Sequence, residues 1–159
     1  MSRKYLNDRW CVRCGRKEAT PYLRKNTKLF PEKGLVLDIG CGNGRNSIYM
    51  AGLGYGVYPI DMVDDFGIEI ILGEDPLPDV KYDILLANYI LMFLDDDTRA
   101  KVMSEINDRS KEGSVLMIEM YPAKDAYEYD FDSMVDYFLS SGWNKVRKSK
   151  DRCVLRKIS

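Results

Sequence analysis

The sequence predicts an α/β domain that is built on a largely parallel sheet. Short apolar runs, typical of buried strands, alternate along the chain with segments of helical periodicity. Glycine-rich turns separate these segments, and one such turn lies between a strand and a helix. The chain of 159 residues has the length of one domain, which is enough to bury a single core.

The elements can be assigned in order along the chain. Thr20 and Pro21 have the residue types of a helix N-cap and a first helical position, and this helix is expected to end near Leu29. Further helices are expected over residues 45–53, 95–110 and 131–141. Strands of the parallel sheet are expected over residues 35–39, 56–60, 68–72, 82–87 and 114–120. The tail, residues 143–158, predicts a closing hairpin.

Two connections are too short for a complete doubly wound sheet. Residues 62–67 separate the second and third strands, and residues 73–81 separate the third and fourth. Because a parallel crossover usually needs about a dozen residues or more, we expect the helices after the second and third strands to be missing. Either loops span these crossings or the third strand is irregular.

Composition excludes several classes of chemistry and location. The chain has no histidine, which excludes an imidazole base, a Ser-His-Asp triad and a histidine-ligated metal. Cys11 and Cys14 form a C-x-x-C pair, but no second pair follows to complete a tetrahedral zinc site, so no metal is expected. The absence of a secretory signal and of any apolar run near about 20 residues indicates a cytoplasmic protein without a membrane segment.

Positive charge is concentrated at the N-terminus. Residues 1–33 contain ten lysines and arginines but three acids, whereas the whole chain has a net charge of −1. We interpret residues 1–33 as a basic cap or lid segment and residues 34–159 as the ligand-binding domain. The segment suits contact with an anionic substrate or RNA, but a solvated helical surface would have the same composition.

A glycine-rich turn, from Asp38 to Gly44, lies between the first strand and the following helix. Glycines there let a ligand approach the backbone without a Cβ in the way. Asp38 would repel a pyrophosphate but favour a ligand that carries an ammonium and a sulfonium. Arg45 occupies a place where a dinucleotide-binding turn has glycine or alanine, and no P-loop is present. Asp61, 23 residues after Asp38 and next to a strand end, is placed to accept hydrogen bonds from ribose hydroxyls.

These residues resemble a known family. The segment from Val36 to Gly44 resembles the first motif of class I S-adenosylmethionine (SAM) dependent methyltransferases. Its continuation to Ala51, with residues 20–23 before it, is similar to the tellurite-resistance branch and related small-molecule methyltransferases. The resemblance implies a Rossmann-like sheet, mostly parallel with a C-terminal antiparallel hairpin, here reduced in helices after the second and third strands.

The resemblance also implies SAM as the cofactor and assigns residues to each part of it. The methionine end would lie against the glycine turn, which comprises Asp38, Gly40, Cys41, Gly42, Asn43 and Gly44. Asp61 would hold the ribose, and Met62 would pack against adenine. Asp75 matches the acid that meets the adenine amino group, although Glu74 is adjacent and suits the same role.

Asn88 and Tyr89 follow the fourth strand and match the family position that faces the methyl donor and the acceptor. The transfer itself needs mainly alignment and exclusion of water. An acceptor that must lose a proton would also need a carboxylate, tyrosine or lysine as its base. Tyr89 and Glu119, both at strand ends, are the candidates for this catalytic role. A thiolate or metalloid acceptor would need no base.

We therefore expect a SAM-dependent methyltransferase that acts, as a monomer or homodimer, on a small molecule. Residues 87–90 lack the two prolines that follow the fourth strand in DNA amino-methyltransferases, which disfavours that activity. Two alternatives stay open. One is a non-catalytic domain that binds SAM or a partner, and the other is an RNA-binding or RNA-modifying module that uses the basic N-terminal segment.

Overall fold

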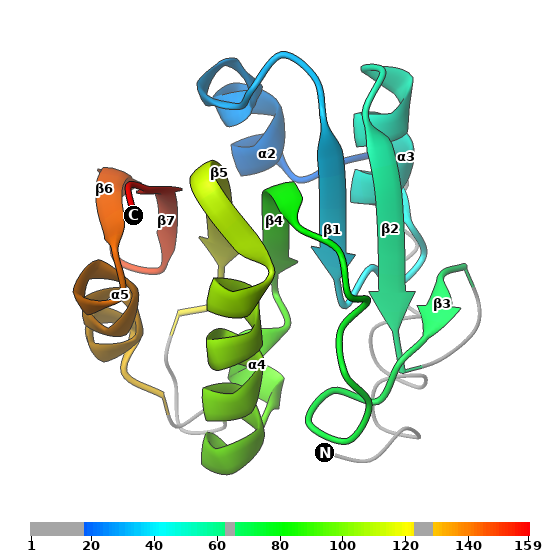
Figure 1. Cartoon of the computed structure of the whole chain (residues 1–159). Helices are drawn as coiled ribbons and strands as arrows, with labels where there is room; N and C mark the ends of the chain where they lie inside the picture. Colours follow the sequence, from blue (N-terminus) through cyan, green and yellow to red (C-terminus); the bar gives the residue numbers. More distant parts are fainter. Residues whose placement is uncertain (1–17, 63–65, 123–128) are drawn as a thin grey trace.

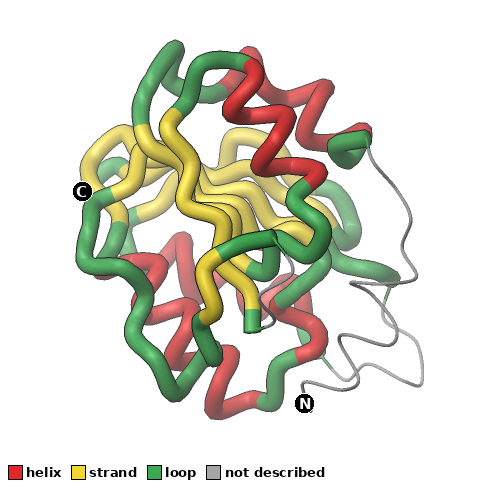
Figure 2. Tube along the Cα trace, turned by 90° about the vertical axis from the view of Figure 1, so that its right-hand side faces the viewer, coloured by secondary structure: helices red, strands yellow, loops and turns green. Residues whose placement is uncertain are grey.

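A computed structural model describes residues 18–62, 66–122 and 129–159, in which helices flank both faces of a seven-stranded sheet (Figure 1, Figure 2). The strands lie in the order β3-β2-β1-β4-β5-β7-β6. Their bounds are β1 Leu35–Ile39, β2 Gly56–Asp61, β3 Ile68–Glu69, β4 Tyr82–Asn88, β5 Ser110–Glu119, β6 Trp143–Lys148 and β7 Arg152–Lys157. The α-helices are α2 Pro21–Asn26, α3 Arg45–Gly52, α4 Asp96–Asp108 and α5 Phe131–Ser140, and the 3-10 turns are η2 Thr27–Leu29 and η3 Leu91–Phe93.

Strands β3, β2, β1, β4 and β5 run parallel, whereas β7 is antiparallel to both of its neighbours, β5 and β6. Leu37 of β1 pairs with Tyr58 of β2 on one side and with Leu85 of β4 on the other. The prediction of a mostly parallel α/β sheet with a C-terminal antiparallel hairpin is confirmed. Because parallel strands share one carboxyl edge, the segments that follow β1, β2 and β4 come together at the lower end of the sheet in Figure 1.

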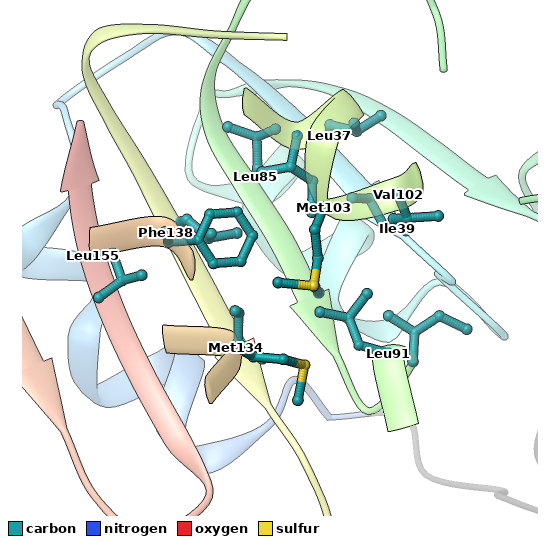
Figure 3. Close-up of a cluster of buried hydrophobic side chains, with 14 of the residues drawn as sticks. Leu37, Ile39, Leu85, Leu91, Val102, Met103, Met134, Phe138 and Leu155 are labelled. Carbon is teal, nitrogen blue, oxygen red and sulfur yellow. The ribbon is translucent and has the colours of Figure 1, made fainter. Parts of the chain in front are cut away.

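Successive residues of the central strands pack into two separate cores. Val36 belongs to a buried cluster that includes residues of α2 and α3. Leu37 belongs to the cluster on the other face, where Met103 of α4 and Phe138 of α5 lie against the sheet (Figure 3). Because both faces are covered, the central strands are apolar throughout, which is why they appear as continuous apolar runs in the sequence.

The helices begin where cap residues predict. The Thr20 hydroxyl accepts a hydrogen bond from the Leu23 amide (3.3 Å) at the start of α2, and Asp95 accepts one from the Thr98 amide (2.8 Å) at the start of α4. None of the helices in the described ranges has the length and apolar character needed to span a membrane.

The third strand is shorter than the sequence indicated. The strand expected over residues 68–72 is reduced to Ile68–Glu69, which pairs with the end of β2. The chain then turns, because the Ile71 amide donates to Oδ2 of Asp75 (2.9 Å) and the Glu74 amide donates to the Ile71 carbonyl (3.0 Å). The described residues between β2 and β4 contain no helix, so the prediction of missing helices is confirmed there.

The described part of the basic N-terminal segment packs onto the sheet. Ala19, Leu23 and Phe30 are buried in the cluster that contains Val36. Residues 1–17, and with them Cys11 and Cys14, lie outside the described residues.

Candidate cofactor site

The predicted glycine turn follows β1 directly and leads into α3. Gly40, Gly42 and Gly44 have positive φ angles of 70°, 55° and 82°, a conformation that residues with a Cβ disfavour. A Cβ on Gly40 would lie 2.7 Å from Cγ1 of Ile90, so this glycine also permits a close contact with the segment after β4. The Gly44 amide closes the turn by donating to the Cys41 carbonyl (2.9 Å). The turn thus depends on glycine for both its conformation and its packing.

Asp61, the last residue of β2, ties this turn to the neighbouring strand. Its Oδ2 accepts a hydrogen bond from the Gly42 amide (2.8 Å), and the Cys41 amide donates to the carbonyl of Ile60 (2.9 Å). The Asp61 side chain is almost fully buried. The acid that the sequence placed near a strand end is therefore held beside the glycine turn.

Asp38 precedes the turn and is buried within the domain. The Ser47 hydroxyl of α3 donates a hydrogen bond to its Oδ2 (2.6 Å). Burial raises the pKa of Asp38 to about 6, the hydrogen bond from Ser47 opposes this shift, and the charge of Asp61 adds to it. The carboxylate is therefore ionised at neutral pH, and a cation bound beside it would favour the ionised form further.

The larger of two cavities at this edge has a volume of about 270 Å³. Asp61, Met62 and Glu74 line it from the side of β2 and the loop after β3. The segment after β4 lines it from the other side, through Ile90, Leu94, Asp95, Thr98 and Lys101. Acids therefore stand beside apolar side chains here, which suits a nucleoside with an apolar base face and polar edges.

A smaller cavity of about 70 Å³ shares one lining residue, Gly40, with the first. The glycine turn forms one of its walls, and Asn88, Tyr89 and Tyr121 form another. The smaller cavity thus connects the turn with the ends of β4 and β5.

A buried carboxylate organises this second wall. Glu119, at the end of β5, has no exposed surface. It accepts hydrogen bonds from the Thr20 hydroxyl (2.5 Å), the Asn88 amide nitrogen and the Tyr89 hydroxyl (3.3 Å). Its Oε1 also lies 3.4 Å from Nε of Arg152, an ion-pair distance. Glu119 therefore joins the N-terminal segment, β4 and β7 at one point, and we call these five residues the Glu119 network.

Tyr89 is held in a conformation that is unusual for its residue type. Its φ is 58°, the one positive value among non-glycine residues in the described part of the chain. The ring packs against Tyr121 with centroids 4.7 Å apart, and the hydroxyl accepts a hydrogen bond from Nη2 of Arg152 (3.3 Å). Burial raises the pKa of Tyr89. Backbone strain of this kind is concentrated at functional sites.

Asn88 provides a test of whether the smaller cavity fits a ligand. Its Nδ2 donates to Glu119, which fixes the orientation of the side-chain amide. Its Oδ1 is buried and has no hydrogen-bond partner among the described residues. A buried acceptor without a partner is costly, so this oxygen fits a ligand that brings an N–H group, such as the ammonium of SAM.

Most predicted site residues lie at this edge. The larger cavity is lined by Gly40, Asp61, Met62 and Glu74, and the smaller one by Asp38, Gly40, Cys41, Gly42, Asn43, Asn88 and Tyr89. Gly44 and Asp75 line neither cavity. Gly44 lies beside the Phe66 ring, which a Cβ at this position would meet. The Asp75 carboxylate accepts a hydrogen bond from the Ile71 amide in its own loop.

Several lining residues, contributed by helices and by the segment after β5, were not predicted from the sequence. They are Asn46, Thr98, Lys101 and Tyr121. The signal that could have found Tyr121 is its place after a parallel strand, because such positions reach the shared carboxyl edge. The helical residues carry no such signal.

Comparison with known proteins agrees with this geometry. Residues 13–150 match a family described as a methyltransferase domain, which covers most of the chain. Among curated proteins, none matches the sequence significantly.

Three solved structures illustrate the likeness in fold. A TehB-like SAM-dependent methyltransferase from Corynebacterium glutamicum has 18% identity and a TM-score of 0.73, and the match covers 97% of both chains. TehB from Haemophilus influenzae has 16% identity and a TM-score of 0.74 over 97% of this chain and 66% of that one. The 1,6-didemethyltoxoflavin-N1-methyltransferase of Burkholderia thailandensis, with S-adenosylhomocysteine bound, has 15% identity and a TM-score of 0.67 over 80% and 72%.

At these identities the structural likeness concerns the fold, whereas the match over residues 13–150 shows the family. The presence of TehB-type proteins among the similar structures agrees with the branch that the sequence resembles. The chain therefore belongs, as predicted, to the methyltransferase-domain family, and its fold is that of SAM-dependent methyltransferases.

Proposed function

We propose that the chain binds SAM across the two cavities that share Gly40 and transfers its methyl group to a small-molecule acceptor. The observation that carries this proposal is the meeting of the two cavities at Gly40, with Asp61 in the larger and Asp38 in the smaller. A nucleoside linked to an amino acid is an elongated ligand, and it matches two neighbouring cavities on either side of one residue better than a compact ligand would.

The larger cavity would hold the nucleoside. Asp61 would accept hydrogen bonds from the ribose hydroxyls, Met62 would pack against the adenine ring, and Glu74 would accept from the adenine amino group. All three side chains line this cavity. Asp75 would reach the adenine only by giving up its hydrogen bond to the Ile71 amide, which favours Glu74 for this role.

The smaller cavity would hold the amino-acid end. The glycine turn allows close approach to the backbone, and Asp38 supplies a negative charge. Oδ1 of Asn88 would accept a hydrogen bond from the ligand's ammonium, which would satisfy the buried oxygen. SAM, when bound, supplies a methyl group on a sulfonium, which is a good leaving group.

The acceptor would lie beside Tyr89 and Tyr121, which line the smaller cavity. Since burial raises the pKa of Tyr89, its hydroxyl stays protonated at neutral pH and serves as a hydrogen-bond donor rather than a base. The Glu119 carboxylate is occupied by four neighbours, which supports a positioning role. These environments favour an acceptor that is nucleophilic without losing a proton, such as a thiolate.

We also propose that residues 1–33 cap the acceptor side of the site. Two contacts of Thr20 support this role. Its hydroxyl donates to Glu119, and its amide donates to Oδ1 of Asn46 (3.0 Å), a residue that lines the smaller cavity. Movement of this segment would therefore be transmitted to both walls of that cavity.

Calorimetric titration with SAM and with S-adenosylhomocysteine tests the site. We expect micromolar binding by the wild-type protein and a loss of about 1–3 kcal/mol in Asp61→Ala, the value of a lost hydrogen-bonding acid. Asp79→Ala is the matched control, because Asp79 is a fully exposed acid that lies 3.9 Å from Arg109 and lines neither cavity. Glu74→Gln should weaken binding more than Asp75→Asn.

The remaining outcomes separate the alternatives. Formation of S-adenosylhomocysteine with any member of a panel of small thiols, amines and phenols would support catalysis on small molecules. Tight SAM binding without turnover on any of them would favour a non-catalytic SAM-binding domain. Failure of the folded protein to bind either ligand would contradict the proposed site.

A further inference from the structure

The charges of this protein are strongly segregated along the chain. Residues 34–142 contain seven basic and twenty-one acidic residues. The last seventeen residues, 143–159, contain seven basic residues and one acid, and residues 18–33 contain four basic residues and two acids. A near-neutral net charge therefore conceals two basic segments on an acidic domain.

The fold brings the two basic segments together. Nη1 of Arg147 in β6 donates to Oδ1 of Asn26 in α2 (2.6 Å), and Nη2 of Arg156 in β7 donates to the Leu29 carbonyl (2.9 Å). These two bonds tie the hairpin of β6 and β7, at the left edge of the sheet in Figure 1, to α2 and η2. We define the basic face as six of the exposed cations on these elements: Arg24, Lys25 and Lys28 of α2 and η2, and Arg147, Lys150 and Arg156 of the hairpin.

Protection of an edge strand does not account for this face. Lysines on an exposed strand prevent pairing with other chains, which explains Lys145 and Lys148 on the edge strand β6. Arg156, however, lies on β7, which is paired on both sides. The cations of α2 and η2 are not on a strand at all.

We propose that the basic face binds the phosphate backbone of single-stranded RNA. Interfaces with nucleic acid are polar and positively charged, whereas protein interfaces have an apolar core. None of the large exposed apolar side chains in the described residues lies on β6, β7, α2 or η2, and one of them, Ile158, directly follows β7. The basic face is therefore complementary in charge to a polyanion, but it lacks the exposed apolar side chains that would form the core of an interface with a protein.

The shape of the basic face favours a single strand over a duplex. Readers of the DNA major groove present a projecting helix or ribbon. Here α2 has six residues and lies with Leu23 and Asn26 buried against the rest of the domain. A flexible strand can follow cations that are spread over a helix and a hairpin, and electrostatic contacts of this kind need no sequence preference.

Fluorescence anisotropy with a labelled 20-nucleotide single-stranded RNA tests the proposal with the full chain. We expect binding at 50 mM salt that weakens steeply by 200 mM. Lys25→Ala combined with Lys28→Ala should weaken binding about tenfold and lower the salt slope by about 1.4, since each phosphate contact on a single strand contributes about 0.7. Lys150→Ala, on the hairpin side, should weaken it about threefold.

A control with the same change in net charge is Ala100→Glu combined with Ser104→Glu. Both residues are exposed on α4, which covers the opposite face of the sheet. This variant should bind RNA within about twofold of wild type, with thermal unfolding confirming that all variants are folded.

The following results would overturn the proposal. They are absence of binding at 50 mM salt, an equal loss in the α4 control, wild-type binding by the Lys25 and Lys28 variant, and equal affinity for a duplex of the same sequence. Binding to anionic lipid vesicles in preference to the RNA would equally contradict it. None of these results bears on the SAM site, because the basic face shares no residue with either cavity.

Discussion

The backbone amide of Gly42 donates a hydrogen bond to Oδ2 of Asp61 across 2.8 Å. This bond joins the turn after β1 to the end of β2, two segments that are adjacent in the sheet. The same carboxylate lines the larger cavity. Asp61 therefore contributes to the shape of the turn and to the proposed ribose contact, and an alanine variant reports both effects together.

Substitution of Asp61 by asparagine separates these two roles. Asparagine keeps an oxygen that can accept from the Gly42 amide but loses the negative charge. We expect Asp61→Asn to lower the free energy of unfolding by less than about 1 kcal/mol, against about 1–3 kcal/mol for Asp61→Ala. Both variants should bind SAM more weakly. Urea unfolding followed by circular dichroism measures the difference, and equal stability losses would argue against the structural role of this hydrogen bond.

Gly40 is the residue where a small change should disturb both cavities. In Gly40→Ala, the positive φ and the close contact with Ile90 should cost about 1–3 kcal/mol of stability. We expect SAM affinity to fall at least tenfold in calorimetry. Gly52→Ala is the matched control, because a Cβ there at the end of α3 meets open space and alanine favours the helix by about 0.5–1 kcal/mol. Wild-type affinity in Gly40→Ala would be incompatible with the proposed position of the cofactor.

Asp38 should make SAM binding pH-dependent. Burial raises its pKa to about 6, so the carboxylate becomes protonated as the pH falls from 7 to 5. We expect weaker SAM binding at pH 5 than at pH 7.5, with an inflection near pH 6, in titrations at half-unit steps. Asp38→Asn should bind weakly with a flat profile. Ser47→Ala removes a hydrogen bond that opposes the rise in the pKa of Asp38, so the inflection in SAM binding should move to a higher pH. If both variants keep the wild-type pH profile, the pH dependence belongs to another group.

The same pKa has the opposite consequence for stability. The pKa of Asp38 is higher in the folded state than its ordinary value of 3.8, so the folded state binds more protons between these two values. The stability contributed by protonated Asp38 is fully present below about pH 4 and is lost as the pH rises through about 6. We therefore expect the melting temperature of Asp38→Asn, relative to wild type, to increase from pH 4.5 to pH 7.5. A difference that stays constant over this range would contradict the shifted pKa.

The sequence allowed prediction of those parts of the site that depend on local signals. The strand, glycine turn and helix from Leu35 to Gly52 depend on residues within a few positions of one another. Closely spaced glycines in the sequence directly indicate a tight turn of the backbone. Residues 68–72 show where this reasoning fails. Their apolar run predicts a strand, but the hydrogen bond from the Ile71 amide to Asp75 ends it by a local turn. Side chains that bind nearby backbone compete with sheet pairing in ways that an apolar pattern does not reveal.

The Glu119 network could not be predicted for a different reason. Thr20 and Glu119 are 99 positions apart, and Arg152 reaches Glu119 because these two residues are paired in the register of β5 and β7. A register shift of one residue would place Arg152 on the other face of the sheet. Position at a strand end indicated Glu119 as a candidate base, but only the assembled sheet surrounds it with donors.

Substitution of Glu119 by glutamine distinguishes a positioning residue from a base. Glutamine has nearly the same shape, but if its oxygen keeps accepting from Asn88 and Thr20, its N–H groups face the Arg152 guanidinium and the Tyr89 hydroxyl, which now interact with the other carboxylate oxygen. We expect SAM affinity and the free energy of unfolding to fall together, the latter by about 1–3 kcal/mol, because a buried acceptor is replaced by an N–H group beside a partly exposed arginine. Asp83→Asn is the control, because Asp83 binds the Leu35 amide at the other end of β4 and should affect stability alone. If Glu119→Gln instead keeps wild-type stability and SAM affinity but shows no turnover, Glu119 is the base.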